Sequence, residues 1–485
     1  MPAPPDPGLL AGGAGGPRAL RPLLDVVLAA LADGAAARGG PLPPGGPDAV
    51  ARRVAALGPF LPEQGVGGEA ALREQIEALA EGAADPADPH CVAHLHCPPL
   101  ALAAAADLAA SALNPSLDSW DQAPAASVLE ERLTRELAAL VHPRGPAPDA
   151  LVTTGGTESN LLGALLAREA HGIRLTVICG ANAHHSVHRA TWLLGLPEPV
   201  VLPTPRGVLD AAGVRAALAG LPADSPALVV ATAGTTDTGA VDPLVPLADA
   251  VADRRATGRP TALHVDAAYG GPLLFSDALA ARLAGLDRAD TVALDLHKLG
   301  WQPAAAGLLT VPDAATLRPL DHSADYLNAE DDTAAGLPDL LGRSLRTTRR
   351  PDVLKIAVTL RALGRAGLGA LVDATCAAAE ELADLVAAEP CLRLHARPTI
   401  STVLFRPTGA DDPQVAAIRR RLLADGRAVL GRATAHDPAD PEGPPVLWLK
   451  ATLLNPHAQA SDLAALVKLV LDHAHHGEVP AHDRR

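Results

Sequence analysis

The most informative stretch of the sequence is Thr291-Val-Ala-Leu-Asp-Leu-His-Lys-Leu-Gly-Trp301. It opens as an apolar run typical of a buried strand, and a His-Lys pair follows that run. The chain holds 40 Lys and Arg residues, of which only four are lysines: Lys298, Lys355, Lys450 and Lys468. Arginine can replace lysine in ion pairs, but it stays protonated near neutral pH and cannot form an imine. A lysine kept beside a histidine at a strand exit therefore favours carbonyl chemistry.

In the residues that lead up to this stretch, short apolar runs alternate with helical segments. The runs are 175–179, 199–202, 227–232, 261–265 and 291–294, and the helical segments are 160–171, 188–194, 209–218 and 244–255. This alternation predicts an α/β fold, with a mostly parallel sheet covered by helices on both faces. Ligands bind at the carboxyl ends of such strands, and the polar clusters of this chain lie at those ends.

The length of 485 residues predicts more than one domain. We expect an N-terminal helical segment over 1–99, a large α/β domain over 100–350 and a small α+β domain over 351–485. In the last of these, a long helix from 353 precedes strands at 392–394, 399–405 and 446–453 and helices at 413–425 and 461–473.

Composition narrows the class of protein. A formal net charge of −15, without a run of cations, argues against a nucleic-acid partner. The five cysteines are scattered and have no CxxC spacing, which fits a reducing cytoplasm better than a disulfide framework. No segment is long and apolar enough to cross a bilayer without a charge or a proline. We expect a soluble, cytoplasmic protein with no membrane partner.

Three further polar clusters follow apolar runs. Thr153-Thr-Gly-Gly-Thr-Glu-Ser-Asn160 opens a helix and has the glycines of a phosphate-binding turn, although such turns are often only structural. Ala183-His-His-Ser-Val-His-Arg-Ala190 holds adjacent histidines, which point in different directions and so make a poor metal site. His264-Val-Asp-Ala-Ala-Tyr-Gly-Gly271 places a carboxylate at a strand end, where it needs a partner.

Taken together, these clusters supply what pyridoxal phosphate requires: a phosphate turn, a ring-sized side chain, an anion for the pyridinium nitrogen and an amine for the aldehyde. A joint occurrence by chance is much less plausible than any one of them. The sequence therefore predicts pyridoxal 5'-phosphate as the cofactor, and we expect no metal.

The ordered segments 93–99, 114–130, 155–160, 183–190, 264–271 and 295–298 resemble those of the group II pyridoxal-phosphate-dependent amino acid decarboxylases. The resemblance covers about 89–455, so most of the chain. It implies the fold type I architecture of aspartate aminotransferase, with a seven-stranded large sheet. It also implies a homodimer whose active site is shared between the two chains and whose N-terminal helices wrap the partner.

The resemblance also implies site residues. Lys298 would bind the cofactor aldehyde, Asp266 would pair with the pyridine nitrogen and His184 would stack on the ring, with Tyr326 as the proton donor of a mobile loop. The remaining cofactor contacts would be Gly155, Gly156, Thr157, Ala268, Asp295 and His297.

The implied reaction is loss of carbon dioxide from an L-amino acid. The segment 114–124 lies where the family lines its substrate pocket, and it resembles the diaminobutyrate and siderophore-pathway lysine members most. Its acidic side chains suggest that the distal ammonium of a diamino acid binds there, and the expected substrate residues are His94, Asp118, Trp120 and Asp121. The two aspartates would instead serve a dimer interface or a helix cap if that reading is wrong.

Other functions stay open on the sequence alone. The chain is an aromatic or acidic amino acid decarboxylase, or another fold type I pyridoxal phosphate enzyme, if the substrate segment has been misread. An inactive paralogue that serves as a scaffold is the non-enzyme alternative, against which the intact set of Lys298, Asp266 and His184 argues. The residues also leave open whether Arg349 and Arg350 bind a carboxylate or stabilise a domain junction.

Overall fold

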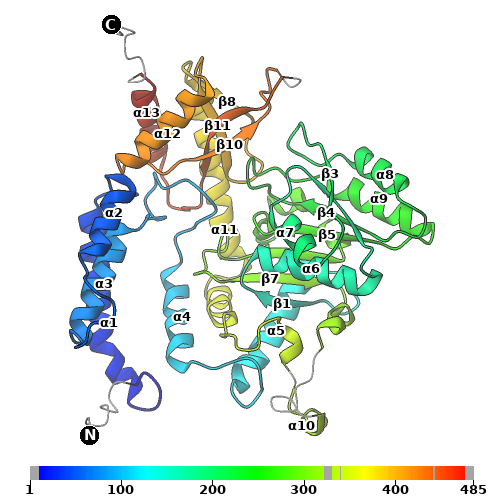
Figure 1. The fold of residues 1–485 in the computed structure, drawn as a ribbon, viewed down its shortest axis with the longest axis horizontal. Helices are drawn as coiled ribbons and strands as arrows, with labels where there is room; N and C mark the ends of the chain where they lie inside the picture. The colour runs from blue at the N-terminus through cyan, green and yellow to red at the C-terminus, as the bar shows by residue number, and fades with distance from the viewer. Residues whose placement is uncertain (1–9, 322–329, 339, 441–442, 476–485) are drawn as a thin grey trace.

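A seven-stranded sheet forms the centre of the molecule, in a computed structural model that describes residues 10–321, 330–338, 340–440 and 443–475 (Figure 1). Its order is β1-β7-β6-β5-β4-β2-β3. The strands are β1 (Asp149–Thr153), β2 (Thr176–Gly180), β3 (Val200–Leu202), β4 (Ala227–Thr232), β5 (Thr261–Ala267), β6 (Thr291–Asp295) and β7 (Gly307–Val311). The pairs from β3 to β6 are parallel, while β7 runs antiparallel to both β6 and β1.

The central strands read as unbroken apolar runs because both faces of the sheet are covered. β4 and β5 are buried along their whole length. Helices α5 (Pro124–Val141), α8 (Ala211–Gly220) and α9 (Leu244–Ala256) share one hydrophobic cluster with the sheet. Helices α6 (Gly156–His171) and α7 (Ser186–Leu193) belong to clusters with the alternate strand residues. The sheet is thus sandwiched between two layers of helices.

A second, antiparallel sheet has the order β10-β11-β9-β8. Its strands are β8 (Leu392–Leu394), β9 (Thr402–Pro407), β10 (Gly431–Ala435) and β11 (Val446–Thr452), and it packs with α12 (Asp412–Ala424) and α13 (Ala460–His475). The long helix α11 (Val353–Ala388) contributes to the cores of both sheets and bends at Gly364, which has left-handed backbone torsion. This helix joins the two parts of the fold.

The N-terminal helices stand at one side of the molecule (left in Figure 1). α1 (Gly16–Arg38) and α3 (Gly68–Gly82) pack side by side, with α2 (Gly46–Ala55) at their upper end. Arg38 holds this group together through an ion pair with Asp85. α4 (Ala101–Leu113) packs on α11. These helices leave large apolar side chains exposed to solvent, namely Leu28, Leu31, Leu79, Leu102, Leu108 and Leu113.

Short helical segments complete the described chain. They are the 3-10 helices η2 (Gly271–Phe275), η3 (Ala280–Leu283), η4 (Leu286–Arg288), η5 (Ala314–Leu320) and η6 (Leu341–Arg343), and the α-helix α10 (Glu330–Ala334). Within the described residues, no helix has the length and apolar character needed to span a membrane.

The structure confirms the expected fold, a mostly parallel α/β sheet with a smaller α+β part and N-terminal helices. The five expected strands of the large sheet are present, with ends shifted by at most two residues. The sequence analysis noted only an apolar run before Thr153 at the position of β1, and it did not identify β7 or β10 as strands. Arg349 is buried and makes two 2.7 Å hydrogen bonds to Glu130, so it joins α5 to the start of α11.

Candidate functional site

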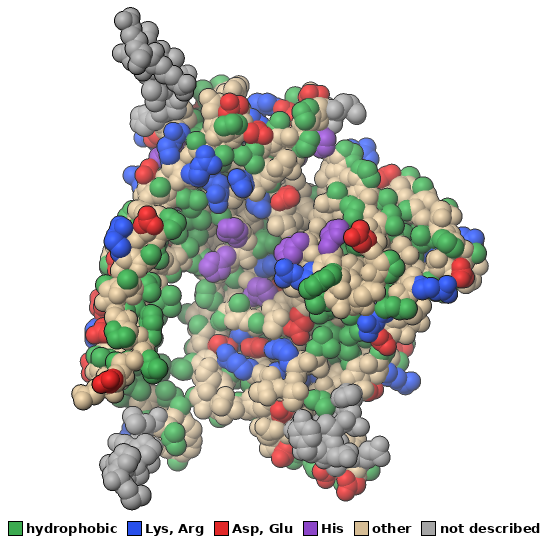
Figure 2. Space-filling view, in the orientation of Figure 1, with side chains coloured by type: hydrophobic (Ala, Val, Ile, Leu, Met, Phe, Trp, Pro, Cys, Tyr) green, Lys and Arg blue, Asp and Glu red, His purple; other side chains and the backbone are tan. Residues whose placement is uncertain are grey.

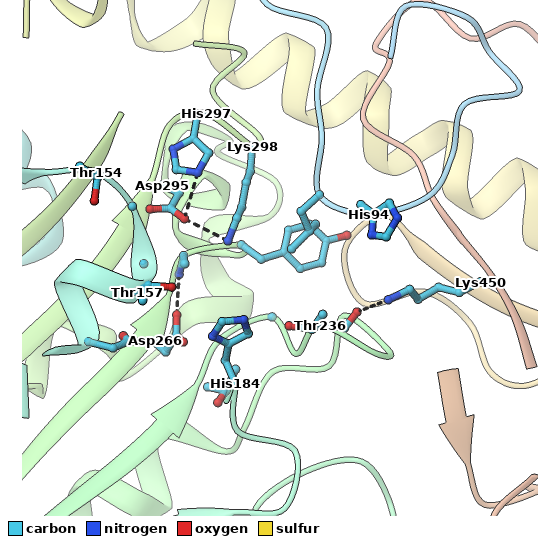
Figure 3. Close-up of a pocket in the computed structure, with 18 residues that line it drawn as sticks. His94, Thr154, Thr157, His184, Thr236, Asp266, Asp295, His297, Lys298 and Lys450 are labelled. Carbon is cyan, nitrogen blue, oxygen red and sulfur yellow. Dashed lines mark hydrogen bonds and ion pairs between the residues drawn. The ribbon is translucent and has the colours of Figure 1, made fainter. Parts of the chain in front are cut away.

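A cavity of about 370 Å³ opens at the carboxyl ends of the parallel strands, where the large sheet faces the small one (Figure 3). Its lining comes from loops after β1, β2, β4, β5 and β6, from the 93–99 segment and from β11: His94, Leu95, Thr154, Gly155, Gly156, Thr157, Asn160, His184, Thr232, Gly234, Thr236, Asp266, Ala268, Tyr269, Asp295, His297, Lys298 and Lys450. Figure 2, which has the orientation of Figure 1, shows histidines gathered with Lys and Arg side chains near the middle of the molecule. All nine expected cofactor contacts lie in this lining.

Lys298 enters the cavity from the turn after β6. Its ammonium nitrogen lies 3.0 Å from Oδ2 of Asp295, three residues earlier in the chain. Asp295 is 1% exposed, and its other oxygen, Oδ1, accepts no hydrogen bond from the described residues. The lysine is therefore held by one carboxylate while its amine faces the cavity, as Figure 3 shows.

Two glycines shape the turn between β1 and α6. Gly155 has φ of 146°, a backbone conformation that side chains disfavour, and a Cβ there would lie 2.9 Å from Cε1 of His297. A Cβ on Gly156 would lie 2.8 Å from the Ala268 Cβ. The first N–H groups of α6 have no helical acceptor and open at this turn. The turn thus forms a tight cradle for an anion at a helix N-terminus.

His297 borders this cradle beside Gly155. Its Nδ1 accepts a 3.3 Å hydrogen bond from the backbone N–H of Ala306. Its Nε2 lies 3.6 Å from Oδ2 of Asp295. The ring is held in place beside the glycine turn, where a phosphate oxygen would be within its reach.

Asp266 ends β5 and is almost fully buried. Its Oδ2 accepts a 2.7 Å hydrogen bond from Nδ2 of Asn160, and its Oδ1 accepts a 3.1 Å hydrogen bond from the backbone N–H of Ala268. These donors compensate a buried carboxylate and fix its plane. An anion held in this way suits a protonated ring nitrogen.

His184 follows β2 and lines the cavity together with Ala268, which follows β5. Burial lowers the pKa of this histidine, and neighbouring Asp266 only partly opposes that effect. The ring is therefore neutral at physiological pH and presents a flat surface. A planar heteroaromatic group would fit between this ring and the Ala268 methyl group.

The opposite wall carries two groups from elsewhere in the chain. Lys450, on β11, donates a 2.9 Å hydrogen bond to the carbonyl oxygen of Thr236. Burial lowers the pKa of this lysine. His94 has a left-handed backbone, with φ of 64°, and burial lowers its pKa, as does the charge of Lys450. This wall therefore carries two basic side chains, each with a pKa below its ordinary value.

Sequence reasoning did not assign Lys450, Asn160 or Tyr269 to the site. Because lysine is rare in this chain, the sequence could have singled out Lys450. Its position beside the cavity depends on how the small sheet packs against the large one, which local sequence does not show. Tyr269 follows Asp266 by three residues, and its hydroxyl bonds Ser401 and Thr402 of the small sheet at 2.8 and 3.0 Å. It lies where the two sheets meet.

Three expected substrate residues do not line the cavity of the single chain. Asp118, Trp120 and Asp121 lie in the segment before α5. There, Ser119 donates a 2.6 Å hydrogen bond to Asp121, and Gln122 donates a 2.7 Å hydrogen bond to Asp118. His94 alone of the four does line the cavity. Tyr326 lies outside the described residues.

The residues present fit pyridoxal phosphate. The glycine cradle leaves room that a single Cβ would fill, the carboxylate of Asp266 is fixed at the far end and Lys298 offers the amine between them. Among the described residues, no group of three or more His, Cys, Asp or Glu side chains is placed to hold a metal ion.

Comparison with known proteins is consistent with this site. Residues 68–408 match the model of the pyridoxal-dependent decarboxylase conserved domain. An L-2,4-diaminobutyrate decarboxylase of Rhizobium meliloti (strain 1021) is 40% identical over 412 residues, which cover 82% of this chain and 80% of the relative. An enzyme of the same name from Acinetobacter baumannii is 33% identical over 448 residues, covering 85% of both.

A solved structure is also similar over nearly the whole chain. It is the glutamate decarboxylase domain of diaminobutyrate-pyruvate transaminase and L-2,4-diaminobutyrate decarboxylase from Vibrio parahaemolyticus. The TM-score is 0.81 at 29% identity, and the match covers 96% of this chain and 98% of that one.

Proposed function

The chain belongs to the pyridoxal-dependent decarboxylase family, and from that premise we propose that it converts an L-diamino acid, 2,4-diaminobutyrate or lysine, to the corresponding amine and carbon dioxide. It is a carboxy-lyase with pyridoxal 5'-phosphate as its cofactor. The cofactor supplies an aldehyde for the substrate amine and a ring that accepts electrons when the bond from Cα to the carboxylate breaks. The observation that carries the proposal is the cavity in which Lys298, Asp266 and the glycine cradle meet.

Each group of the cavity has a proposed task. Lys298 provides the amine that binds the cofactor, and Asp266 keeps a proton on the ring nitrogen, which stabilises the developing negative charge. Gly155, Gly156, Thr157 and His297 hold the phosphate, supported by the cradle geometry. His184 and Ala268 hold the ring faces, and Asp295 orients Lys298.

Tyr326 is proposed to return a proton to Cα after carbon dioxide leaves. Replacing it with phenylalanine should slow amine formation and, in the presence of dioxygen as the oxidant, raise the share of aldehyde and ammonia among the products, with hydrogen peroxide formed from the dioxygen. A product ratio that stays at the parent value would remove this role.

A diamino substrate needs a partner for its distal ammonium. Among the described residues that line the cavity, the carboxylates are Asp266 and Asp295, and the tasks proposed above commit the first to the ring nitrogen and the second to Lys298. Lys450 and His94 make the opposite wall cationic or neutral, which suits a carboxylate rather than an ammonium. We therefore assign the ammonium to Asp118 and Asp121 of a second chain, with Trp120 beside them.

This assignment requires the proposed homodimer. The exposed leucines of α1, α3 and α4 support it, because a cluster of large apolar side chains on one set of helices is typical of a protein contact. We propose that residues 1–99 wrap the partner, that 100–350 form the cofactor domain and that 351–485 form the small domain. A cytoplasmic location is also proposed, supported by five unpaired cysteines.

A substrate panel on the purified dimer tests the function. Carbon dioxide, amine, ammonia and aldehyde would be measured together for diaminobutyrate, lysine, ornithine, glutamate and DOPA. The highest kcat/KM is expected for a diamino acid, with amine and carbon dioxide in equal amounts. Preference for glutamate or DOPA would overturn the diamino assignment, aldehyde as the main product would point to another reaction of the same fold, and no turnover would favour a scaffold.

The substrate residues have a matched test. Asp118→Asn with Asp121→Asn should lower kcat/KM for diaminobutyrate by about 100-fold, because an unpaired buried ammonium is costly, but should change the value for uncharged 2-aminobutyrate much less. An equal loss for both substrates would assign the aspartates to structure.

A further inference from the structure

Asn160 is a buried residue of α6 at the edge of the cavity, and its side chain contacts three polar groups. Its Nδ2 donates to Oδ2 of Asp266 at 2.7 Å and to Oγ of Ser186 at 2.8 Å. Its Oδ1 lies 2.9 Å from Nε2 of His264. The amide orientation follows from chemistry, because a carboxylate can only accept and must therefore face the amide nitrogen. The amide oxygen is then left for His264.

His264 fixes the other side of the amide. The ring is fully buried on β5, and burial lowers its pKa to about 4, so it is neutral and carries one ring proton. That proton must be on Nε2, since the facing amide oxygen can only accept. Nδ1 then accepts from the hydroxyl of Thr291 at 2.8 Å. A Cβ on Gly163 would lie 2.6 Å from Nδ1, so only glycine leaves room for this ring.

Ser186 continues the chain of hydrogen bonds to the cavity. Its hydroxyl oxygen accepts from Asn160, and its own proton is free to be donated to Nδ1 of His184 at 2.8 Å. The backbone N–H of Ser186 also donates to this Nδ1, at 3.3 Å. With two donors aimed at Nδ1, the single proton of the neutral His184 ring belongs on Nε2.

We propose that Asn160 is a positioning residue that orients Asp266 and, through Ser186, sets the tautomer of His184. One amide thus controls two groups that face the cofactor ring from different directions. Its fixed orientation makes the carboxylate an acceptor in a set plane and makes His184 a donor through Nε2. His184 cannot then serve as a base through Nδ1.

The tautomer of His184 can be read directly in the holoenzyme by 15N NMR with ring-labelled histidine, assigned with His184→Gln. The parent protein should show an unprotonated Nδ1. Ser186→Ala removes the hydroxyl donor at 2.8 Å but keeps the longer backbone N–H donor at 3.3 Å and the bond between Asn160 and Asp266, so the signal of the second tautomer should appear beside that of the first. The affinity for pyridoxal phosphate should change by less than about threefold, because the contacts of Asp266 remain.

Thr291→Val is the matched control. It removes one buried hydrogen bond of the same network and should lower stability, yet the orientation of Asn160 is still set by Asp266. The 15N pattern of His184 should stay as in the parent protein. This control separates a loss of stability from a loss of positioning.

Asn160→Ala removes the hydrogen bonds to both Asp266 and Ser186. It should free the His184 tautomer as Ser186→Ala does and should also weaken cofactor binding by about tenfold, because a hydrogen bond to a charged group is lost. A parent protein with a proton on Nδ1, or a Ser186→Ala spectrum identical to that of the parent, would overturn the proposal even if Asn160→Ala does not fold. The readout needs no substrate, so it stands apart from the diamino acid assignment.

Discussion

Lys298 and Lys450 reach the same cavity from two different sheets, and their surroundings separate their tasks. Lys298 follows β6 and lies 3.0 Å from Oδ2 of Asp295. Lys450 is on β11 and bonds a backbone carbonyl, and burial lowers its pKa. The first is held beside the glycine cradle where an aldehyde would be bound, while the second lies on the opposite wall. This difference supports the proposal that Lys298, and not Lys450, bonds the cofactor.

Replacing Lys298 with arginine should therefore abolish the reaction while keeping the charge. Activity should fall by roughly a thousand-fold or more, because the guanidinium cannot form an imine. Borohydride reduction followed by peptide mass spectrometry should find the cofactor on the peptide holding Lys298 in the parent protein and nowhere in the variant. Lys468→Arg, at an exposed position, is the control and should keep both label and activity. A label retained by the Lys298 variant would refute the assignment.

Single residues differed in how well the sequence revealed them. Lys298 and Asp266 could be found because each ends a strand-like run with a polar group that needs a reason to be there. Asn160 could not be found in this way. It lies near the start of a helix, and its role depends on hydrogen bonds to His264 and Asp266, which are about a hundred residues away in the sequence. Which residues become hydrogen-bond partners of this kind depends on the order of the strands in the sheet, and local sequence patterns do not determine that order.

Burial of His264 should make stability depend on pH. Its pKa is about 4 in the folded chain against 6.5 as the ordinary value, so the unfolded chain binds the proton more readily. The free energy of unfolding should then fall as the pH drops from 6.5 towards 4, by up to roughly 3 kcal/mol from this group.

Urea denaturation across this range checks the pH effect. His264→Gln, which cannot titrate, should flatten the acid limb of the stability curve. His457→Gln changes an exposed side chain and should leave the limb unaltered. An acid limb as steep in His264→Gln as in the parent protein would show that this histidine is not the source.

At the scale of elements, α6 begins at the cofactor cradle. The residues that cap it at its two ends are glycines with positive φ. Gly155 has φ of 146° and no room for a Cβ, whereas Gly172 has φ of 90° and nothing within 4 Å. Alanine at either position strains the backbone by about 1 kcal/mol. Only at Gly155 does it also push against His297.

Gly155→Ala should thus weaken pyridoxal phosphate binding by more than tenfold, since the added methyl group displaces His297 from the cradle. Gly172→Ala should lower the melting temperature to a similar extent but leave cofactor affinity within about twofold. Equilibrium dialysis of both variants gives the two dissociation constants. Equal affinities would mean that the turn does not bind the phosphate.

The helices and strands also differ in how well sequence patterns predict them. The parallel strands β2, β4, β5 and β6 and the helices between them were predictable, because apolar runs and helical periods alternate in a regular order. β7 was missed since it returns antiparallel between β1 and β6 after the connection 296–306, and nothing in its five residues fixes those neighbours. β10 was missed for the opposite reason, because its exposed alternate residues make the run too polar to stand out.

At the scale of the whole molecule, α4 presents an unusually apolar surface. Leu102 and Leu113 are 41% and 74% exposed. They are eleven residues apart, which at about 100° per residue places them within roughly 20° of each other on the helix. The segment with Asp118, Trp120 and Asp121 follows this helix directly. A contact made through α4 would carry that segment towards the other chain.

A mixing experiment decides whether two chains build one site. Lys298→Ala and the double variant Asp118→Asn, Asp121→Asn should each be nearly inactive on diaminobutyrate. Co-expressed with two different affinity tags, they form mixed dimers in which one site has its lysine from one chain and its aspartates from the other. That site is intact only if the aspartates act across the interface, so purified mixed dimers should recover about half the activity per dimer. If the aspartates act within their own chain, both sites stay damaged and no activity returns, because each site then carries one of the two lesions.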